Sequence, residues 1–238
     1  MIKFKNVNVK YEKDKYALRD FNLQIDDGEF VFIVGKTGAG KSTIFKLLTQ
    51  EIKPTSGSIK VFKNKLEFMH VKSIPYYRRN LGIIFQNFRL LPDKNVYNNI
   101  AFAQEIIGES SFRIKKRVMK VLNLVGLRNK SRKYPRELSG GEQQKVAIAR
   151  AIINKPSIIL ADEPTGNLDE VSSNEIMDLL LHINDTGATV IVITHDLHLV
   201  SRLNKRVVRI NNGSVISDTI GLDDELLDYI NTNDSNYN

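Results

Sequence analysis

The sequence predicts an α/β protein in which helices cover a parallel sheet. Short, mostly apolar runs occur at Phe30–Val34, Ser157–Ala161 and Ala188–Ile193, as expected of strands buried on both faces. A stretch with helical periodicity, Glu170–Ile183, separates the last two runs. Between about residues 93 and 153 the strand pattern disappears and helical periodicity takes over. We therefore expect a mostly helical segment inserted into an α/β domain.

The other elements follow from local patterns. Residues 2–34 read as strands, with the turn Asp27-Gly28 before the run at 30–34, and Leu81–Phe85 is a further strand. The expected helices are Thr43–Leu48, Val96–Ile107, Phe112–Val125 and Gly140–Ile153. Asn211-Asn212-Gly213 predicts a hairpin, and an acidic tail over 218–238 ends the sequence. No Pro/Gly/Ser-rich linker divides the chain, so we expect one domain over residues 2–238.

Composition narrows the class of protein. With 238 residues, 42% hydrophobic and 26% charged, the chain is neither fibrous nor disordered. Its apolar runs are far shorter than the roughly 18 residues of a membrane-spanning helix, and it has no cysteine, so we expect a cytoplasmic protein. The net charge is +8, and Arg113–Arg136 contains ten Lys or Arg and no acid. This stretch suits nucleic acid, an anionic membrane surface, or simply solvated helix faces.

A glycine-rich loop, Gly35–Ser42, lies between the run at 30–34 and the helix that follows. It fits the phosphate-binding pattern G-x-x-x-x-G-K-S in the strand-loop-helix context that this pattern requires. Glycines let backbone N–H groups turn toward phosphates, and the helix start adds positive potential. Lys41 is placed to reach the β- and γ-phosphates, and the Ser42 hydroxyl to bind Mg²⁺. The loop predicts nucleotide binding; a chance glycine-rich turn is the alternative.

Two adjacent acids, Asp162 and Glu163, end the apolar run at 158–161. Alone they would be read as a solvated acid pair at a strand end. Together with the phosphate loop, Asp162 is predicted to bind Mg²⁺ and Glu163 to act as the base for an attacking water. A two-carboxylate glycosidase would leave the phosphate loop unexplained.

The segment 138–144 opens a helix, with Ser139 as N-cap and Glu142 three residues later as in a capping box. Capping alone would be a sufficient explanation. However, Gly140 and Gly141 weaken the helix by about 1 kcal/mol each relative to alanine, and they leave N–H groups open to an anion. The sequence therefore predicts a second anion site at a helix start.

Taken together, these motifs resemble those of the ATP-binding-cassette (ABC) ATPases over residues 2–217. The matching elements, in order, are Tyr11, 35–42, Gln86, 138–144, 158–163, Gly166-Asn167-Leu168-Asp169 and His195. The resemblance implies a P-loop NTPase cassette with a RecA-like parallel-sheet core, an N-terminal antiparallel β subdomain and an inserted helical subdomain. The core and β subdomain would occupy 1–87 and 154–217, and the helical subdomain 88–153.

The resemblance also implies residue roles, with ATP and Mg²⁺ as cofactors. Two cassettes would pack head to tail, so that the signature segment of one covers ATP held by the other. Catalytic residues would be Glu163, His195, Gln86 and Lys41; Mg²⁺ ligands would be Ser42, Gln86 and Asp162. Residues implied to contact ATP are Tyr11, Gly35, Lys36, Thr37, Gly38, Ala39, Gly40, Lys41, Ser42, Thr43, Ser139, Gly140, Gly141, Glu142 and Asp169. Without the family, Tyr11, Gln86, His195 and Asp169 would be ordinary packing, solvated, hydrogen-bonding and helix-capping residues.

The loop after Gln86 carries three large apolar side chains, Phe88, Leu90 and Leu91. They pack either in the core of the helical part or against a partner's helix. Residues 82–92 and 105–108 resemble the cell-division members of the family, which act with an integral membrane protein to control peptidoglycan hydrolases. This implies a homodimer at the cytoplasmic face of the plasma membrane, at the division septum, with no specific nucleic acid.

Two residues depart from the pattern of the cell-division members. Asn87 stands where Asp is usual, and Lys145 where Arg is usual, so we expect weaker carboxylate pairing at 145. Cassettes of lipoprotein-releasing and macrolide-exporting systems share most of the motifs and are the main alternative. A soluble cassette acting on DNA or ribosomes is a third reading, which the basic stretch supports.

Overall fold

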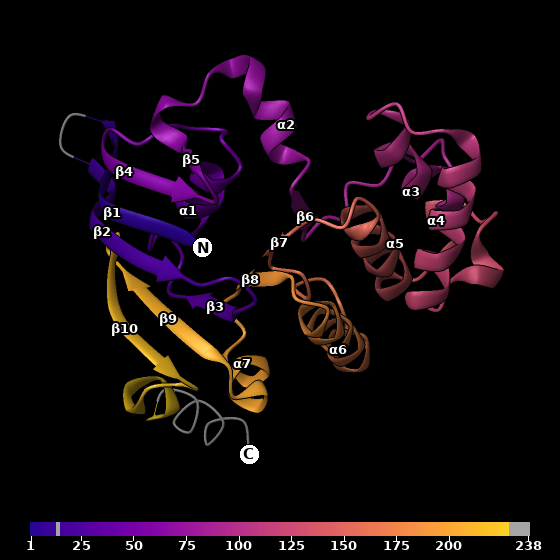
Figure 1. Ribbon diagram of the computed structural model, residues 1–238. Coiled ribbons are helices and arrows are strands. Elements are labelled where there is room, and N and C mark those ends of the chain that lie inside the picture. Colours follow the sequence, from indigo (N-terminus) through magenta and orange to yellow (C-terminus); the bar gives the residue numbers. More distant parts are fainter. Residues whose placement is uncertain (13–14, 229–238) are drawn as a thin grey trace. The chain divides into compact units, whose positions relative to one another are not determined.

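The computed structural model describes residues 1–12 and 15–228 (Figure 1). It divides into two compact units, Met1–Ile74 with the chain from Ile191 onward, and Pro75–Val190. These boundaries do not coincide with the expected helical subdomain at 88–153, and that finer division stays a prediction. Of the helices that the structure describes, none has the length and apolarity needed to span a bilayer.

The first unit contains a four-stranded antiparallel sheet in the order β2-β1-β4-β5 (Figure 1). Its strands are β1 (Ile2–Glu12), β2 (Lys15–Ile25), β4 (Ser56–Val61) and β5 (Asn64–Lys65). Phe4 faces Leu23 on β2 and Ile59 on β4, and its ring meets Phe21 edge-on at 5.3 Å. One face of this sheet is therefore apolar and buried. β4 and β5 were not predicted from the sequence, and neither were the short 3-10 turns at Leu66–Phe68 and Val71–Ser73 that follow them.

The first unit also contains the predicted buried parallel strand. β3 (Phe30–Val34) is buried along its whole length and pairs in parallel with β9 (Arg206–Asn211). The helix α1 (Lys41–Leu48) follows β3, and α7 (Leu197–Leu203) precedes β9. β9 continues into β10 (Ser214–Ile220) as an antiparallel hairpin, which confirms and lengthens the predicted one.

The segment expected as an acidic tail from residue 218 is packed onto the first unit, at least as far as residue 228. Asp218 lies within β10 and pairs with Arg206, which also bonds Glu29 at 2.8 Å. Arg209 donates to Glu225 at 2.7 and 2.8 Å. Three of the acids in the expected tail, Asp218, Asp223 and Glu225, are thus partners of two arginines on β9. The rest of the expected tail, 229–238, lies outside the described residues.

The second unit combines two parallel strands with the predicted helices. The strands are β6 (Leu81–Phe85) and β7 (Ile158–Asp162), and β8 (Thr189–Ile193) runs from this unit into the first. The helices are α2 (Ile74–Arg78), α3 (Val96–Glu105), α4 (Ser111–Leu124), α5 (Gly140–Ile152) and α6 (Glu170–Asp185), with 3-10 turns at Arg128–Lys130 and Pro135–Glu137. Helical periodicity therefore predicted the type of structure correctly between 93 and 153.

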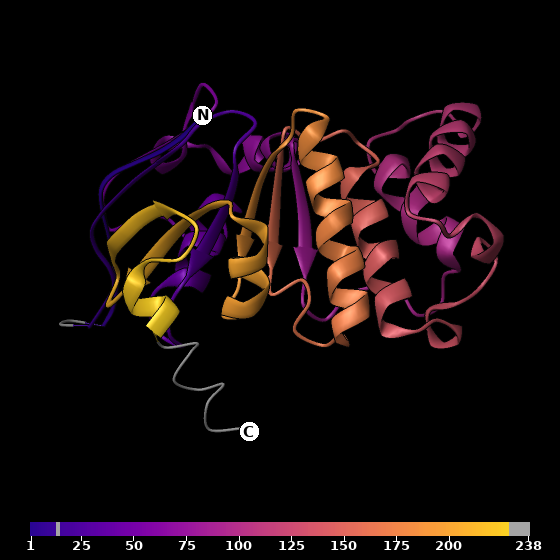
Figure 2. The ribbon, with the colours of Figure 1, turned by 90° about the horizontal axis from the view of Figure 1, so that it is seen from below.

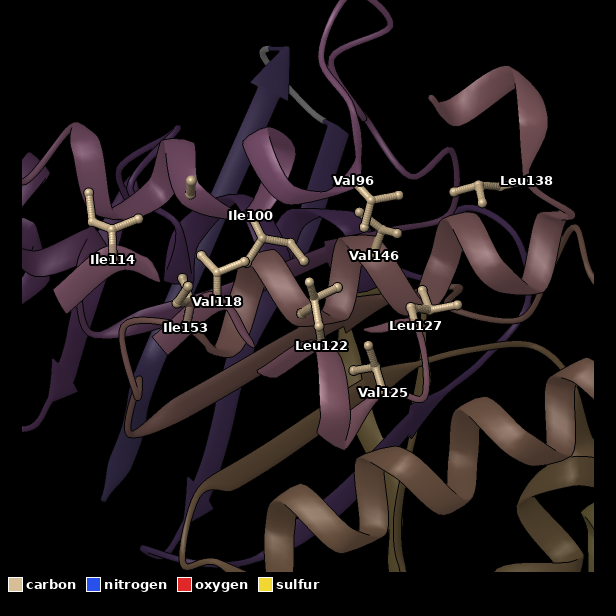
Figure 3. Packing of buried hydrophobic residues seen from close by; sticks show 12 residues of the cluster. Val96, Ile100, Ile114, Val118, Leu122, Val125, Leu127, Leu138, Val146 and Ile153 are labelled. Atoms are coloured by element: carbon tan, nitrogen blue, oxygen red, sulfur yellow. The ribbon is translucent and has the colours of Figure 1, made fainter. Parts of the chain in front are cut away.

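A single apolar cluster holds the inserted helices together (Figure 3). It contains Ile100 from α3, Val118 and Leu122 from α4, and Val146 and Ile153 from α5 and its end. All five side chains are buried, and α6 lies beside α5 (Figure 2). This packing fixes the start of α5, where the second predicted anion site lies.

Candidate functional site

The phosphate-binding loop is in the first unit, between β3 and α1. The Lys41 side chain lies against the loop, and its ammonium donates to the carbonyl oxygens of Gly35 and Lys36, at 2.5 and 3.3 Å. Gly40 caps α1 without a side-chain acceptor, so no side-chain cap covers the first N–H groups of the helix. A lysine within a loop at an open helix start is the arrangement that binds phosphate.

Gly40 cannot be replaced without strain. Its φ is 111°, which is outside the range that L side chains adopt readily, and an added Cβ would lie 2.6 Å from the Ala17 carbonyl oxygen. The glycine therefore allows the loop to turn and to pass close to β2. This agrees with the expected need for glycine at this position of the loop.

Tyr11 and Thr43 lie together beside this loop. Tyr11 is 56% exposed as a residue, and its hydroxyl lies 3.3 Å from Thr43 Oγ1. Thr43 is buried, whereas Ser42 is exposed. A largely exposed ring offers a flat face for stacking, and Ser42 keeps its hydroxyl accessible. His195, the last site residue in this unit, is exposed two residues after the end of β8.

Asp162, Glu163 and Gln86 lie at the carboxyl ends of two neighbouring strands in the second unit. β6 and β7 are parallel, and Phe85 pairs with Asp162 in their register. Gln86 and Glu163 are the next residues along these neighbouring strands, so both leave the sheet at the same edge. Glu163 adopts φ 47°, a left-handed conformation that is costly for a residue with a Cβ. Strain of this kind is common at functional positions.

Gln86 is connected to the segment 166–169. Its side-chain amide lies 3.5 Å from Asn167 Oδ1, and Asn167 Nδ2 donates to the Gln86 carbonyl at 3.1 Å. The backbone of Gly166 passes close by, since an added Cβ would lie 2.8 Å from Gln86 Nε2. The role of Asn167 as the partner of Gln86 was not predicted, because nothing in the local sequence around either residue indicates the pairing.

The start of α5 forms the predicted capping box. Ser139 Oγ accepts from the Glu142 backbone N–H at 3.3 Å, and the Glu142 carboxylate accepts from the Ser139 N–H at 3.1 Å. Lys130 also donates to Glu142, and this hydrogen bond holds the pKa of the Glu142 carboxyl below its usual value. The Glu142 carboxylate is thus hydrogen-bonded to both Lys130 and the Ser139 N–H, and these bonds hold the helix start.

The two glycines of this helix start differ in their surroundings. Gly141 is buried, and an added Cβ would lie 2.8 Å from Ser172 Oγ on α6. Close packing between α5 and α6 is therefore a sufficient reason for this glycine. Gly140 is half-buried at the first position of the helix. Of the two, Gly140 has the more accessible backbone.

Asp169 caps α6. Its carboxylate accepts from the backbone N–H and the hydroxyl of Ser172, both at 2.9 Å. These bonds hold the pKa of the Asp169 carboxyl below its usual value, and the bond from the Ser172 backbone N–H has the larger effect. The capping role that the residue type alone suggested is present. Lys145 on α5 pairs with Glu175 of α6 at 2.6 Å, so the lysine at this position does find a carboxylate.

The apolar loop 88–91 is half-buried rather than fully packed. Phe88, Leu90 and Leu91 are all of intermediate exposure, and Leu90 packs against the apolar cluster of the inserted helices. The structure therefore assigns part of this loop to the core of the unit. The rest of each side chain remains at the surface.

Two residues of α5 also bear on these segments and were not singled out from the sequence. Gln144 is fully buried and donates to the Pro164 carbonyl at 2.7 Å. Arg150 donates to the backbone of the loop after Gln86. Both are polar residues on the buried side of an amphipathic helix, and that signal could have found them.

The oxygen donors expected to hold Mg²⁺ are a hydroxyl, an amide and a carboxylate, from Ser42, Gln86 and Asp162. These are hard ligands that suit Mg²⁺, which also needs oxygens from a nucleotide and water to complete its shell. Among the described residues no group of three or more His, Cys, Asp or Glu forms a metal site of its own. The donor set therefore fits a metal that binds together with nucleotide phosphates.

Comparison with known proteins decides the family. The ABC transporter family model matches residues 18–166. This chain belongs to the ABC transporter family. The cell division ATP-binding protein FtsE of Streptococcus pneumoniae is 49% identical over 92% of this chain and 95% of its own length. FtsE of Bacillus subtilis is 47% identical over 92% and 96%, and FtsE of Escherichia coli 41% identical over 90% and 96%.

Solved structures of other cassettes have the same fold as this ABC protein. A dimeric post-hydrolysis state of the ATP-binding cassette MJ0796, bound to ADP and Pi, is 35% identical with a TM-score of 0.82 and covers 94% of this chain and 100% of its own. The cassette cbiO1 of Clostridium perfringens is 32% identical with a TM-score of 0.86, over 92% and 88%. The predicted fold class, family and ATPase class are thereby confirmed. The roles of single site residues stay predictions.

Proposed function

We propose that this ABC ATPase is the ATP-hydrolysing subunit of a membrane complex that acts in bacterial cell division, with an FtsX-like integral membrane protein as its partner. The observation that supports this most is the identity of 41–49% to FtsE of several bacteria over at least 90% of the chain. Through the partner, ATP hydrolysis would control peptidoglycan hydrolases outside the membrane.

ATP would bind first to the loop 35–42. Backbone N–H groups at the open start of α1 and the Lys41 ammonium would hold the phosphates. The exposed Tyr11 ring would stack on the adenine base. The geometry within the first unit supports this role, because lysine, loop and ring lie around one helix start.

Hydrolysis would require the residues at the carboxyl ends of β6 and β7 in the second unit. Ser42, Gln86 and Asp162 would hold Mg²⁺, which neutralises phosphate charge when it is bound. Glu163 would accept a proton from the attacking water, and His195 would hydrogen-bond the γ-phosphate. The register of β6 and β7 supports the pairing of Gln86 with the two acids at one edge.

A second copy of this chain would complete each site. The Ser139–Gly141 helix start of one copy would cover the ATP held by the other, and Asp169 would link the two sites. The cassette MJ0796 is described as dimeric, which supports this arrangement. Closure of the dimer would then control hydrolysis.

The membrane partner would dock near Phe88, Leu90 and Leu91, and this would place the protein peripherally at the cytoplasmic face of the plasma membrane, at the division septum. The half-buried state of these apolar side chains supports a docking role, because part of their surface is available. No specific nucleic acid is expected as a partner.

The test is an affinity purification from native membranes with the Glu163→Gln variant, loaded with ATP, as bait. A membrane protein with four spanning helices and one large outer domain, together with a cell-wall hydrolase, is the expected result. A lipoprotein- or macrolide-exporter subunit would overturn the cell-division role in favour of the exporter alternative. Recovery of RNA or DNA without a membrane protein would overturn both.

A paired variant makes the docking site testable. Phe88→Ser with Leu91→Ser, in the same bait, should lose the membrane partner while ATP affinity is unchanged. Thermal unfolding of this variant separates the two readings of the loop. A large loss of stability would show that the loop belongs to the core. The packing of Leu90 against the apolar cluster already assigns part of the loop to the core.

A further inference from the structure

The turn that follows Gln86 has an unfavourable backbone conformation. Phe88 and Arg89 have φ values of 56° and 48°, so two consecutive residues with side chains are left-handed. Each is disfavoured because its Cβ approaches the following carbonyl oxygen. Neither is Gly, Asn or Asp, the residues that tolerate this region best. Such a turn persists only where its surroundings hold it in place.

Arg150 on α5 holds this turn. One guanidinium nitrogen donates to the Arg89 carbonyl at 2.7 Å and the other to the Phe88 carbonyl at 2.9 Å. The planar fork of an arginine can bond two adjacent carbonyls at once, which a lysine ammonium does less well. The two carbonyl oxygens that Arg150 contacts belong to the two residues with positive φ.

The surroundings of Arg150 are unusual for a cation. It is half-buried, and burial lowers the pKa of its guanidinium. No carboxylate pairs with it among the residues that the structure describes, so the backbone of the turn supplies the partners that the structure gives it. A charge that is partly removed from water without a carboxylate partner is costly, so the two bonds to the turn offset part of that cost.

The same turn touches the opposite end of α5. The Phe88 ring lies against the helix start, with its Cζ atom 3.9 Å from the position that a Cβ on Gly140 would take. The Arg89 guanidinium lies 3.6 Å from the centre of the Phe85 ring at the end of β6. The turn thus lies close to the first residue of α5 and is hydrogen-bonded to Arg150, ten residues further along the same helix.

We propose that Arg150 is a positioning residue that locks the turn 88–89 to α5, so that the signature segment 138–141 and the loop 88–91 move as one body. This rests on the proposed function in one respect, that the loop 88–91 is the contact for the membrane partner. In this role Arg150 does not contact the nucleotide. It transmits a displacement of the helix start to the docking loop.

Loss of the fork should free the turn without disturbing the phosphate loop. The backbone N–H groups of Phe88 and Arg89 donate to Phe85 and Asn87, at 3.3 and 2.5 Å, and these bonds depend on the left-handed turn. In Arg150→Gln, amide hydrogen exchange in a peptide covering 86–91 should become at least tenfold faster. Arg150→Lys tests the fork against charge and bulk, because lysine keeps the charge but not the paired donors; exchange should accelerate by a similar factor.

The control is Arg136→Gln, which removes an exposed arginine from the same unit. Exchange in 86–91 should be unchanged in this variant. The proposal is overturned if exchange in both Arg150 variants equals that of the wild type, or if Arg150→Lys restores full protection. Should Arg150→Gln fail to fold, the lysine variant alone decides between these outcomes.

The functional consequence is measured on the complex of the chain with its co-purified membrane subunit. Stimulation of ATP turnover by that subunit should fall about tenfold in Arg150→Lys, while the KM for ATP changes less than twofold. Unchanged stimulation would overturn the coupling role. If no membrane subunit is recovered at all, the proposed function fails, whereas the exchange experiment on the chain alone still decides whether Arg150 locks the turn.

Discussion

Individual residues of the site are held by contacts that leave little freedom. Lys41 bonds two carbonyls of its own loop, Glu142 bonds a backbone N–H and Lys130, and Asp169 bonds Ser172. Groups that are already oriented lose less entropy when they bind a ligand, so these contacts favour binding as well as stability.

Lys41 is the residue whose removal should affect nucleotide affinity most. Lys41→Ala removes the ammonium that donates to the Gly35 and Lys36 carbonyls of the loop 35–42. We expect ATP affinity to fall at least tenfold in calorimetry, since hydrogen bonds to a charged group contribute about 1.5–3 kcal/mol. The matched control is Lys46→Ala on the same helix, which should bind ATP as the wild type does. Equal affinity in both variants would contradict the phosphate assignment.

Substitution of Gly40 should also weaken ATP binding, but for a different reason than substitution of Lys41. In Gly40→Ala the new methyl group would meet the Ala17 carbonyl and the backbone would be strained at φ 111°. We expect a loss of stability of about 1–3 kcal/mol in urea unfolding, together with weaker ATP binding. Gly38→Ala is the control, because an added Cβ there contacts nothing within 4 Å although its φ is also positive. A loss that is no larger at 40 than at 38 would exclude the clash as its cause.

At the scale of elements, the capping box at the start of α5 makes one contribution to stability depend on pH. The folded pKa of Glu142 is lowered, first by the hydrogen bond from Lys130. Its contribution is therefore complete above the unfolded pKa of about 4.3 and is lost as the pH falls through the folded value. Relative to the wild type, Glu142→Gln should be destabilised by about 0.5–1 kcal/mol at pH 7, since glutamine still accepts from the Ser139 N–H and only the charge that faces Lys130 is lost.

This difference is measured by urea unfolding of both proteins between pH 7 and pH 3.5. It should shrink as the pH falls below the unfolded pKa, because the wild-type carboxyl also becomes protonated as the pH passes through its lowered folded value. A difference that is constant over this range would show that the carboxylate charge does not stabilise the helix start.

Elements with a strong pattern were predictable from the sequence, and weakly patterned ones were not. β3 and β6 were predicted with their observed bounds because buried parallel strands are continuous apolar runs. β4, with Ser56, Gly57 and Lys60, has no such run and is defined by its pairing with β1. α2 has only five residues, too few for a helical period. Their structure depends on contacts with distant parts of the chain.

The same distinction applies to the site. Motifs carried by consecutive residues, such as the loop 35–42 and the capping box, could be identified because the local sequence defines their conformation. The pairing of Gln86 with Asn167 and the two bonds of Arg150 join segments far apart in the chain. The left-handed conformation of Glu163 and Phe88 could not be predicted either, since neither residue type favours it.

For the whole molecule, the two compact units carry complementary groups. The phosphate loop, Tyr11 and His195 belong to the first, and Gln86, the signature segment and the two acids to the second. In the proposed mechanism ATP and Mg²⁺ need groups from both units and from a second copy of the chain. Nucleotide binding and dimerisation are then linked, because a ligand that binds only the assembled site stabilises it.

This linkage predicts an ATP-dependent dimer. With ATP and Mg²⁺, Glu163→Gln should elute from size exclusion with light scattering as a species of about twice the 27.1 kDa chain mass. Adding Lys41→Ala to the same protein should abolish the shift, because ATP is no longer held. A mass that does not respond to ATP in either protein would contradict a site shared between two copies.

The most direct test of the account is the comparison of ATP binding and ATP turnover in the wild type and Glu163→Gln. If Glu163 is the base, the variant should bind ATP with an affinity within a few fold of the wild type. Its turnover should be lower by about 10²–10⁴-fold, the usual contribution of a general base. Turnover close to that of the wild type, with ATP still bound, would contradict the central claim that Glu163, at the carboxyl end of β7, is the base for hydrolysis.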